Sequence, residues 1–577
     1  MSATHSEYSA HSAQAALSSM TARNSLMPWK SFSLNCLLLG MLVTAVYCLV
    51  GSYPLVSLDD PENTIANPHL QGNGNLTAIW TGSYRNMYAP VSYSLWWVLS
   101  RAFDISSPAF SAAAHITNML LHWVAACASF ALLLRLSGPR GRGAFLGAAL
   151  VAVHPVAVEA VAWVSGLRDV LSMSLSMLAL LALTIAGERP SSDLHSNLFR
   201  LAGLAAGILA MLAKPSAIVL PLMLLAWWAV LGRRWKSVLP EFCVLLTQAS
   251  VVALTAASVQ KATEVPPIAS WARPIVAADS LVWYAAQIIS PRVLTIDHGR
   301  LPQLVITPAH VILATAILAL LTIVGLLWRR IGWAMLLSAV TLLPVLGFIT
   351  FDFQRHSTVA DRYAYPALFG VGVIACLLAN SGCTMRLALS AWACLLGVKA
   401  HATTRFWQSS ESLYTRALVH TPGSILAGNG LALMTAADAH PGDENSVTAE
   451  RLFNTVLSYR PGDPLTHANY GQFLLRQSRA AEARKHLEIA ATAYPDQPSV
   501  LNGLGMSLAM TGELNGAAAA LARAAELAPT NVETLLNLSL VERARGNRAR
   551  SRELAERAAL LLNESDPRAA TANELRK

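Results

Sequence analysis

The sequence predicts an all-α protein in two parts, a polytopic helical membrane domain followed by a solenoid of helix pairs. Hydrophobic residues make up 54% of the 577 positions and charged residues 13%, and the mean hydropathy is +0.45. These values lie outside the range of soluble globular domains. The apolar character is confined to residues 32–400, whereas residues 401–577 have an alanine-rich amphipathic pattern with ordinary charge density. We therefore expect one domain over 32–400 and a repeat domain over 401–577.

Residues 1–31 are polar and rich in serine and alanine. They are too long and too weakly charged to begin a cleaved signal peptide, so we interpret them as a cytoplasmic tail. Leu34 to Val50 is then a retained first span. About eleven apolar runs are candidate spans, near 32–51, 109–134, 143–163, 168–187, 199–213, 216–231, 238–258, 305–327, 332–350, 364–380 and 388–400.

The basic residues indicate a topology. They form five clusters beside apolar runs, at Arg23/Lys30, Arg135/Arg140/Arg142, Arg233/Arg234/Lys236, Arg329/Arg330 and Arg386. All five fall on one side of the membrane if residues 274–291 do not cross it, so we interpret that segment as interfacial or re-entrant. The N-terminus is then cytoplasmic, and the loops 52–108, 155–167, 259–304 and 351–363 face outward together with the repeat domain.

Several function classes lack support. The net charge of +9 lies in these topological clusters, so it does not indicate a nucleic-acid partner. Six of the seven cysteines fall within apolar runs, and no CxxC or Cys/His cluster suggests a disulfide framework or a zinc site. Neither a dinucleotide-binding glycine loop nor a Walker lysine motif is present. We predict no cofactor; the residues neither require nor exclude a divalent metal.

A 34-residue period appears in the segments 464–497, 498–531 and 532–565, which is the length of a tetratricopeptide (TPR) helix pair. The recurring residues are Gly471 and Gly505 in the first helix, Ala483/Ala517, Leu487/Leu521 and Ala490/Ala524 in the second, and Pro495 and Pro529 at the end. The third copy has Ser539 and Asn563 instead, as expected of a capping repeat. Pro461 suggests one further copy upstream. These residues predict a solenoid core, with partner binding in its concave groove.

The first outward loop carries a pair of carboxylates, Asp59 and Asp60, directly after the first span. Beside a lipid-linked sugar, one carboxylate could take the proton of an acceptor hydroxyl while the other orients that hydroxyl or contacts the sugar. The structural alternative is a solvated acidic loop or an Asp-Pro turn.

Ionisable residues also stand at the ends of apolar runs, where they are costly and are usually paired or functional. His154, Glu159 and Arg168 lie in one outward loop, and the guanidinium of an arginine there suits a phosphate. The alternative is a structural pair, Glu159–Arg168 or His154–Glu159. Lys214 and the Asp361-Arg362 pair could likewise be phosphate contacts or interfacial anchors.

Taken in order, these motifs resemble a known family. The resemblance is carried by Asp59-Asp60 with Ile65, Asn67 and Pro68; Tyr88 to Ser92; His115, Asn118 and His122; His154 to Trp163; Ala213-Lys214-Pro215; Ala360 to Tyr363; and Trp407 with Glu411. Followed by TPR repeats, this order resembles the transmembrane-and-TPR protein O-mannosyltransferases and their bacterial relatives, which are similar to the C-type glycosyltransferases. One departure is that no aspartate follows Ala226-Trp227-Trp228, where relatives usually carry one.

The resemblance implies a polytopic enzyme that uses a polyprenyl-phosphate sugar. Asp59 or Asp60 would be the catalytic base; Arg168, Lys214 and Arg362 would contact the lipid phosphate, and His154, Glu159 and Asp361 would shape the donor site.

We therefore expect transfer of a hexose, in the first instance mannose, to a hydroxyl of a protein or peptide acceptor. The expected location is the outer face of a bacterial inner membrane, with the repeats in the periplasm. Two alternatives stay open, an oligosaccharide ligase of the O-antigen type and a non-enzymatic TPR scaffold. An oligosaccharide ligase would be expected to have a long late outward loop, and the loop 351–363 is short. The presence of Asp59 and Asp60 argues against a non-enzymatic scaffold.

Overall fold

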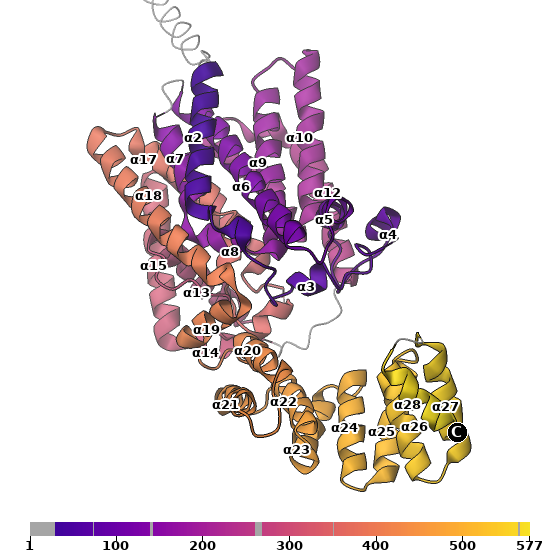
Figure 1. Cartoon of the computed structure of the whole chain (residues 1–577). Coiled ribbons are helices and arrows are strands. Elements are labelled where there is room, and N and C mark those ends of the chain that lie inside the picture. The colour runs from indigo at the N-terminus through magenta and orange to yellow at the C-terminus, as the bar shows by residue number, and fades with distance from the viewer. Residues whose placement is uncertain (1–28, 73, 139–141, 260–267, 350, 564–565) are drawn as a thin grey trace, which may run out of the picture. The chain divides into compact units, whose positions relative to one another are not determined.

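The protein is helical throughout the residues that the computed structural model describes, which are 29–72, 74–138, 142–259, 268–349, 351–563 and 566–577 (Figure 1). Within these ranges there is no β-strand, and a single isolated bridge joins Tyr84 and Met87. The all-α class is thus confirmed. Most of the predicted tail lies outside the described residues, as do Arg23 and Arg140 of the basic clusters.

The chain divides into two compact units, residues 1–416 and 417–577, somewhat later than the predicted division after residue 400. The α-helices of the first unit are α2 (Trp29–Tyr47), α3 (Asp60–Asn63), α4 (Leu76–Thr81), α5 (Pro90–Ala102), α6 (Pro108–Ser137), α7 (Arg142–Val153), α8 (Val158–Ala162), α9 (Leu167–Ala186), α10 (Leu194–Ala213), α11 (Leu220–Val230), α12 (Leu239–Val259), α13 (Arg273–Ile289), α14 (Pro302–Val305), α15 (Pro308–Leu327), α16 (Arg329–Leu342), α17 (Leu368–Ala379) and α18 (Cys383–Thr404). Its 3-10 helices are η1 (Val50–Ser52), η2 (Pro155–Ala157), η3 (Val164–Gly166), η4 (Pro215–Val219), η5 (Trp235–Val238), η6 (Leu343–Val345), η7 (Asp352–Arg355), η8 (Asp361–Ala364) and η9 (Arg405–Gln408).

Seven helices are long and apolar enough to cross a membrane, and they correspond to seven of the eleven predicted runs: α2, α6, α9, α10, α12, α15 and α18. The other four runs take different forms. The run 143–163 is bent by 43° between α7 and the segment Pro155–Ala162, which makes eight spans if the bent pair counts as one. The runs 216–231, 332–350 and 364–380 contain the shorter helices α11, α16 and α17. Hydropathy identified all these helices but overestimated how many are long enough to span.

The predicted interfacial segment 274–291 corresponds to α13. This helix is not among the span candidates by length and composition, so its interfacial placement stays a prediction.

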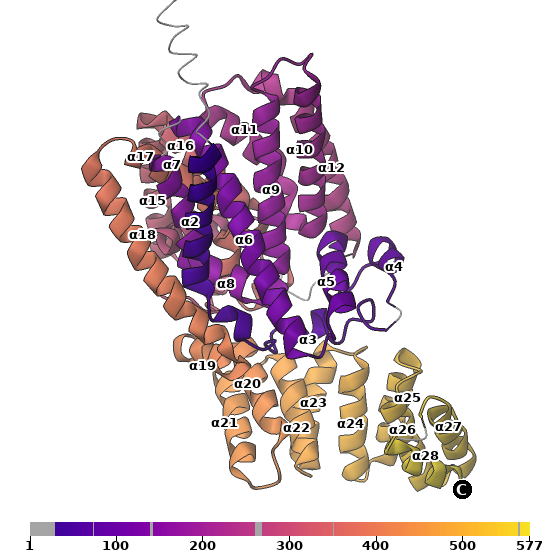
Figure 2. The same cartoon turned by 45° about the horizontal axis from the view of Figure 1, so that its top comes forward.

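Helix packing brings distant polar loops to the ends of a common bundle. α9 packs between α6 and α10, and α7 packs against α6 and α17; Figures 1 and 2 show α6, α9 and α10 side by side. The interior holds large side chains, among them Trp96, Trp227 and Phe369. The Trp227 and Phe369 rings lie 5.4 Å apart between α11 and α17. The loops beyond these helices carry the candidate site.

The boundary helix α19 (Ser410–His420) leads into the second unit, which consists of successive helix pairs. These are α20 (Ile425–Ala437) and α21 (Glu444–Tyr459), α22 (Pro464–Arg476) and α23 (Ala480–Ala493), α24 (Pro498–Met510) and α25 (Leu514–Leu527), α26 (Val532–Ala544) and α27 (Arg548–Leu560), followed by α28 (Arg568–Arg576). A Cβ atom on Gly471 would meet Leu487 Cγ at 2.6 Å, and one on Gly505 would meet Leu521 Cγ at 2.5 Å. The recurring glycines therefore allow each first helix to approach the leucine of its second helix.

Candidate functional site

The loop after α2 holds Asp59 in a strained conformation. Asp59 precedes α3 with a φ of 62°, in the left-handed region, and its side chain does not cap the helix. Aspartate tolerates this region better than most residues, yet strain of this kind often marks functional sites. The residue is exposed. Asp59 thus presents a solvent-accessible carboxylate on a backbone that its surroundings hold in place.

Asp60 is placed differently, because it is fully buried and receives three hydrogen bonds. The backbone N–H of Val56 donates to Oδ2 at 3.1 Å, and the N–H and hydroxyl of Ser165 donate to Oδ1 at 2.8 and 2.6 Å. Burial raises the pKa of Asp60 to about 7, although the bonds from Ser165 and Val56 lower it. Asp60 therefore connects the first loop to the turn around Ser165, whereas Asp59 faces outward.

Further bonds join the same two segments. Trp163 Nε1 donates to the carbonyl oxygen of Leu58 at 2.8 Å, and Asn63 Nδ2 donates to Ser165 Oγ at 3.1 Å. From α6, Asn118 Nδ2 donates to the carbonyl oxygen of Trp163 at 2.7 Å. The acidic loop is thus fixed to the start of α9, which carries Arg168.

Arg168 is half-buried, and its Nε donates to the carbonyl oxygen of Ser165 at 3.4 Å. No carboxylate among the described residues forms an ion pair with it. Burial raises the pKa of Tyr93 in α5, while the charge of Arg168 lowers it and that of Asp59 raises it. Asp59 and Arg168 therefore both lie within electrostatic reach of the Tyr93 hydroxyl.

Lys214, at the end of α10, has a carboxylate partner. Its ammonium pairs with Asp169, the residue after Arg168, and lies 5.5 Å from the centre of the Tyr363 ring. Burial lowers the pKa of Lys214, the charge of Asp169 raises it, and the charges of Arg362 and Arg168 lower it. Three predicted phosphate contacts, Arg168, Lys214 and Arg362, are thus close enough to influence one another.

Arg362 pairs with Glu159 through two donors. Its backbone N–H lies 2.8 Å from Oε2 and its Nη1 lies 2.5 Å from Oε1. The guanidinium also lies over the rings of Phe353, Tyr363 and Trp163, at 4.4, 4.7 and 5.5 Å. The partner of Glu159 is therefore neither Arg168 nor His154, the two alternatives that the sequence left open.

His154 binds backbone groups, whereas Asp361 binds one backbone N–H and the side chain of His298. His154 Nε2 lies 2.8 Å from the carbonyl oxygen of Ile288, and Nδ1 accepts from the Val156 N–H at 3.2 Å. Asp361 accepts from the Thr295 N–H at 3.1 Å and pairs with His298 Nε2 at 3.1 Å. A cavity of about 20 Å³ adjoins Glu159 and Asp361, which is room for roughly one water molecule. The donor-site role predicted for His154 and Asp361 stays a prediction, since these contacts organise the local backbone.

The structure thus groups most of the predicted residues around Trp163, whose indole bonds the acidic loop and stacks against Arg362. Ser165 and Asn63 belong to the same network, but sequence reasoning did not single them out. The one signal was a serine between Trp163 and Arg168 in an otherwise apolar segment. Within the described part of the chain, no group of three or more His, Cys, Asp or Glu side chains could hold a metal ion.

Comparison with known proteins concerns the second unit. The tetratricopeptide repeat family model matches residues 435–498 and 471–532. The second unit contains TPR repeats. No curated protein matches the chain, so the resemblance of the first unit to glycosyltransferases stays a prediction.

Solved TPR structures are similar to this chain over its repeats. MamA from residue 41 onward, of Desulfovibrio magneticus RS-1, is 17% identical, with 27% of this chain and 86% of that one covered and a TM-score of 0.25. YrrB, a TPR protein with an unusual peptide-binding site, is 18% identical, with 29% and 80% covered and a TM-score of 0.25. PilF of Pseudomonas aeruginosa is 19% identical, with 31% and 86% covered and a TM-score of 0.25. These similarities extend no further than the repeat fold.

Proposed function

We propose that this protein is a membrane glycosyltransferase that transfers a hexose, in the first instance mannose, from a polyprenyl-phosphate donor to a protein hydroxyl. The observation that carries the proposal is the arrangement of Asp59 and Arg168. Asp59 is an exposed carboxylate on a strained backbone, and the hydrogen bonds of Asp60 and Trp163 hold its loop against the turn that precedes Arg168. The Arg168 guanidinium forms no ion pair with a carboxylate of the described residues. A base and a phosphate ligand are the two groups that this reaction needs.

In the proposed reaction, Asp59 accepts the proton of the acceptor hydroxyl as its oxygen attacks the anomeric carbon of the sugar. The bond from that carbon to the phosphate oxygen breaks, and its electron pair leaves with the polyprenyl phosphate. Arg168 stabilises the charge that develops on the leaving phosphate. Lys214 and Arg362 add positive potential, although their carboxylate partners occupy part of their hydrogen-bonding capacity.

Asp60 has a positioning role in this proposal. Its three hydrogen bonds hold the first loop against the turn that precedes Arg168. We place the site on the outer face of a bacterial inner membrane, with the N-terminus in the cytoplasm and the TPR unit in the periplasm, on the basis of the basic clusters.

The direct test is transfer from a polyprenyl-phosphate hexose by the purified full-length protein and its Asp59→Asn variant. Asparagine also tolerates the left-handed conformation but cannot act as the base, so we expect transfer to fall by about 10²- to 10⁴-fold. The matched control is Glu62→Gln, which changes a carboxylate in the same loop whose partner is Arg85 at 3.9 Å. Unchanged transfer by Asp59→Asn would remove Asp59 from the mechanism. If the wild-type protein transfers no sugar, the result favours the alternative of a non-enzymatic TPR scaffold.

We propose further that the acceptor protein docks on the first helices of the TPR unit. α20, α22, α24 and α26 are successive neighbours. Each carries an asparagine, and these bond in pairs, Asn469 Nδ2 to Asn429 Oδ1 at 3.0 Å and Asn537 Nδ2 to Asn502 Oδ1 at 3.0 Å. Asn429 is buried, whereas Asn469, Asn502 and Asn537 are half-buried. Side-chain amides both donate and accept hydrogen bonds, so these three suit the backbone of an extended peptide.

Replacing Asn469 and Asn502 together by alanine should raise the KM for a protein acceptor about tenfold or more and leave the KM for a small soluble acceptor unchanged. Asn515→Ala, on the second helix α25, is the control. An equal loss on both acceptors would show that the asparagines support folding and do not dock the acceptor.

A further inference from the structure

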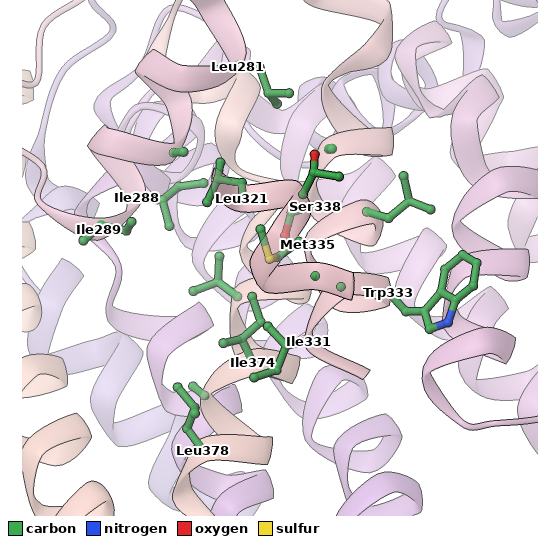
Figure 3. A pocket seen from close by; sticks show the side chains of 18 of the residues that line it. Leu281, Ile288, Ile289, Leu321, Ile331, Trp333, Met335, Ser338, Ile374 and Leu378 are labelled. Carbon is green, nitrogen blue, oxygen red and sulfur yellow. The ribbon is translucent and has the colours of Figure 1, made fainter. Parts of the chain in front are cut away.

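A cavity in the first unit lies among α13, α15, α16, α17 and α18. One part of its wall adjoins His154, whose Nε2 lies 2.8 Å from the carbonyl oxygen of Ile288 and whose ring lies 6.4 Å from that of Trp392. The volume of the cavity is about 740 Å³, within the range of ligand-binding cavities. Figure 3 shows Leu281, Ile288 and Ile289 of α13, Leu321 of α15 and Leu378 of α17 around it. The polar side chains in its wall are satisfied locally, since Thr322 donates to the carbonyl oxygen of Leu318 at 2.8 Å and Ser338 to that of Ala367 at 2.9 Å. Apart from Arg329 and the indole nitrogens of Trp333 and Trp392, the wall therefore offers apolar surface.

This apolar surface belongs to helices at membrane depth and is partly uncovered. Two of the contributing helices, α15 and α18, meet the criteria for membrane spans. Ile289 is 65% exposed and Leu326 74% exposed. The wall contributed by α16 extends from Arg329 to Leu342, which corresponds to about 20 Å of helix. Half of the hydrocarbon core measures about 15 Å, so the wall along α16 is long enough to lie beside one acyl chain of one leaflet.

One end of the cavity is positively charged. Arg329 is its only charged lining residue, and Arg330 follows it. Both side chains are exposed, and neither forms an ion pair with any described residue. Arginine pairs beside apolar surface between membrane helices favour lipid phosphates.

This charged end is remote from the candidate site. α16 and α17 run in opposite directions, because Gly370 lies against Ala334 and Ser338, and Ala367 bonds to Ser338. Arg362 precedes α17 at the Ala367 end. Arg329 lies at the other end of α16, about 13 Å along the helix from Ser338. A phosphate at Arg329 is therefore distinct from a donor phosphate at Arg168 or Arg362.

We propose that this cavity binds an anionic glycerophospholipid, with one acyl chain in the apolar cavity and the phosphate on Arg329 and Arg330. The site needs only that the first unit is embedded in a membrane, and it does not depend on the proposed glycosyl transfer.

The test uses the full-length protein exchanged into micelles that contain equal amounts of a zwitterionic and an anionic phospholipid. Lipid that remains after detergent washing is identified and counted by mass spectrometry. We expect about one anionic phospholipid per chain. The double variant Arg329→Gln/Arg330→Gln should retain it about 30-fold more weakly, whereas Arg234→Gln, from another basic cluster, should not change it. Ala339→Trp should fill the cavity and displace the lipid, while Ala316→Trp, on an exposed part of α15 outside the cavity, should not.

Because Ala339→Trp could impair folding, its thermal unfolding is compared with that of Ala316→Trp, and the arginine variant tests the site independently. Equal retention of both phospholipids, retention unaffected by the arginine variant, or recovery of polyprenyl phosphate in place of phospholipid would each overturn the proposal.

Discussion

The two units of this protein use charged residues in opposite ways. In the first unit, buried ion pairs join segments far apart in the chain, as Glu159 does with Arg362 across 203 positions. In the TPR unit, most ion pairs are exposed and join neighbouring turns or repeats, as Arg523 does with Glu526 and Asp496. Exposed pairs contribute little to stability. Buried pairs are costly to break. Charge in the first unit therefore fixes loops in place, whereas charge in the second keeps a regular solenoid soluble.

The largest expected effect on the free energy of unfolding comes from breaking a buried ion pair. Arg362→Gln leaves the Glu159 carboxylate buried without its cation, which should lower the free energy of unfolding of the first unit by about 3–5 kcal/mol. Glu159→Gln combined with Arg362→Gln removes both charges and should recover most of that loss. The measurement is denaturant unfolding in detergent. Arg523→Gln is the matched change in the TPR unit and should have no measurable effect. If Arg362→Gln behaves like Arg523→Gln, the contrast between the units is wrong.

The next effect concerns packing inside one repeat. Gly505→Val places methyl groups where Leu521 already lies and should cost about 1–3 kcal/mol. Gly516→Ala, in the second helix of the same repeat, meets its nearest neighbour at 3.4 Å. It should stabilise by about 0.5–1 kcal/mol through helix propensity. Hydrogen exchange of the α24 and α25 amides in the full-length chain measures both changes. Effects of the same sign would mean that close helix approach does not explain Gly505.

The same contrast explains what could be predicted from the sequence. Repeats are periodic, so the spacing of Gly471 and Gly505 predicted helix pairs. Hydropathy identified the long apolar helices. Helix length was harder to predict, because a break such as the one at Pro155 divides an apolar run into shorter helices without changing its composition. The partners of the charged residues could not be predicted. Nothing local indicates that Asp60 binds Ser165, 105 positions away, or that Glu159 pairs with Arg362, because these contacts arise only when the helices assemble.

The smallest expected effect is a shift in the pH dependence of the proposed transfer. This shift distinguishes the role of Asp60 from that of Asp59. Ionised Asp60 accepts hydrogen bonds from Val56 and twice from Ser165, whereas protonation turns one carboxyl oxygen into a donor and disrupts at least one of these bonds. With its pKa raised to about 7 by burial, Asp60 should be ionised above this pH, so proposed glycosyl transfer should increase as the pH rises from 6 to 8.

Ser165→Ala removes the hydroxyl donor that lowers this pKa. The pKa should therefore rise further, and the half-maximal rate should move to higher pH by about one unit. Ser165→Thr, which keeps the hydroxyl, should restore the wild-type profile. The measurement is kcat against pH for the three proteins. A lower rate with an unmoved profile would mean that Ser165 supports the loop without acting through Asp60, because loss of the hydrogen bond from Ser165 to Asp60 should raise the pKa of Asp60.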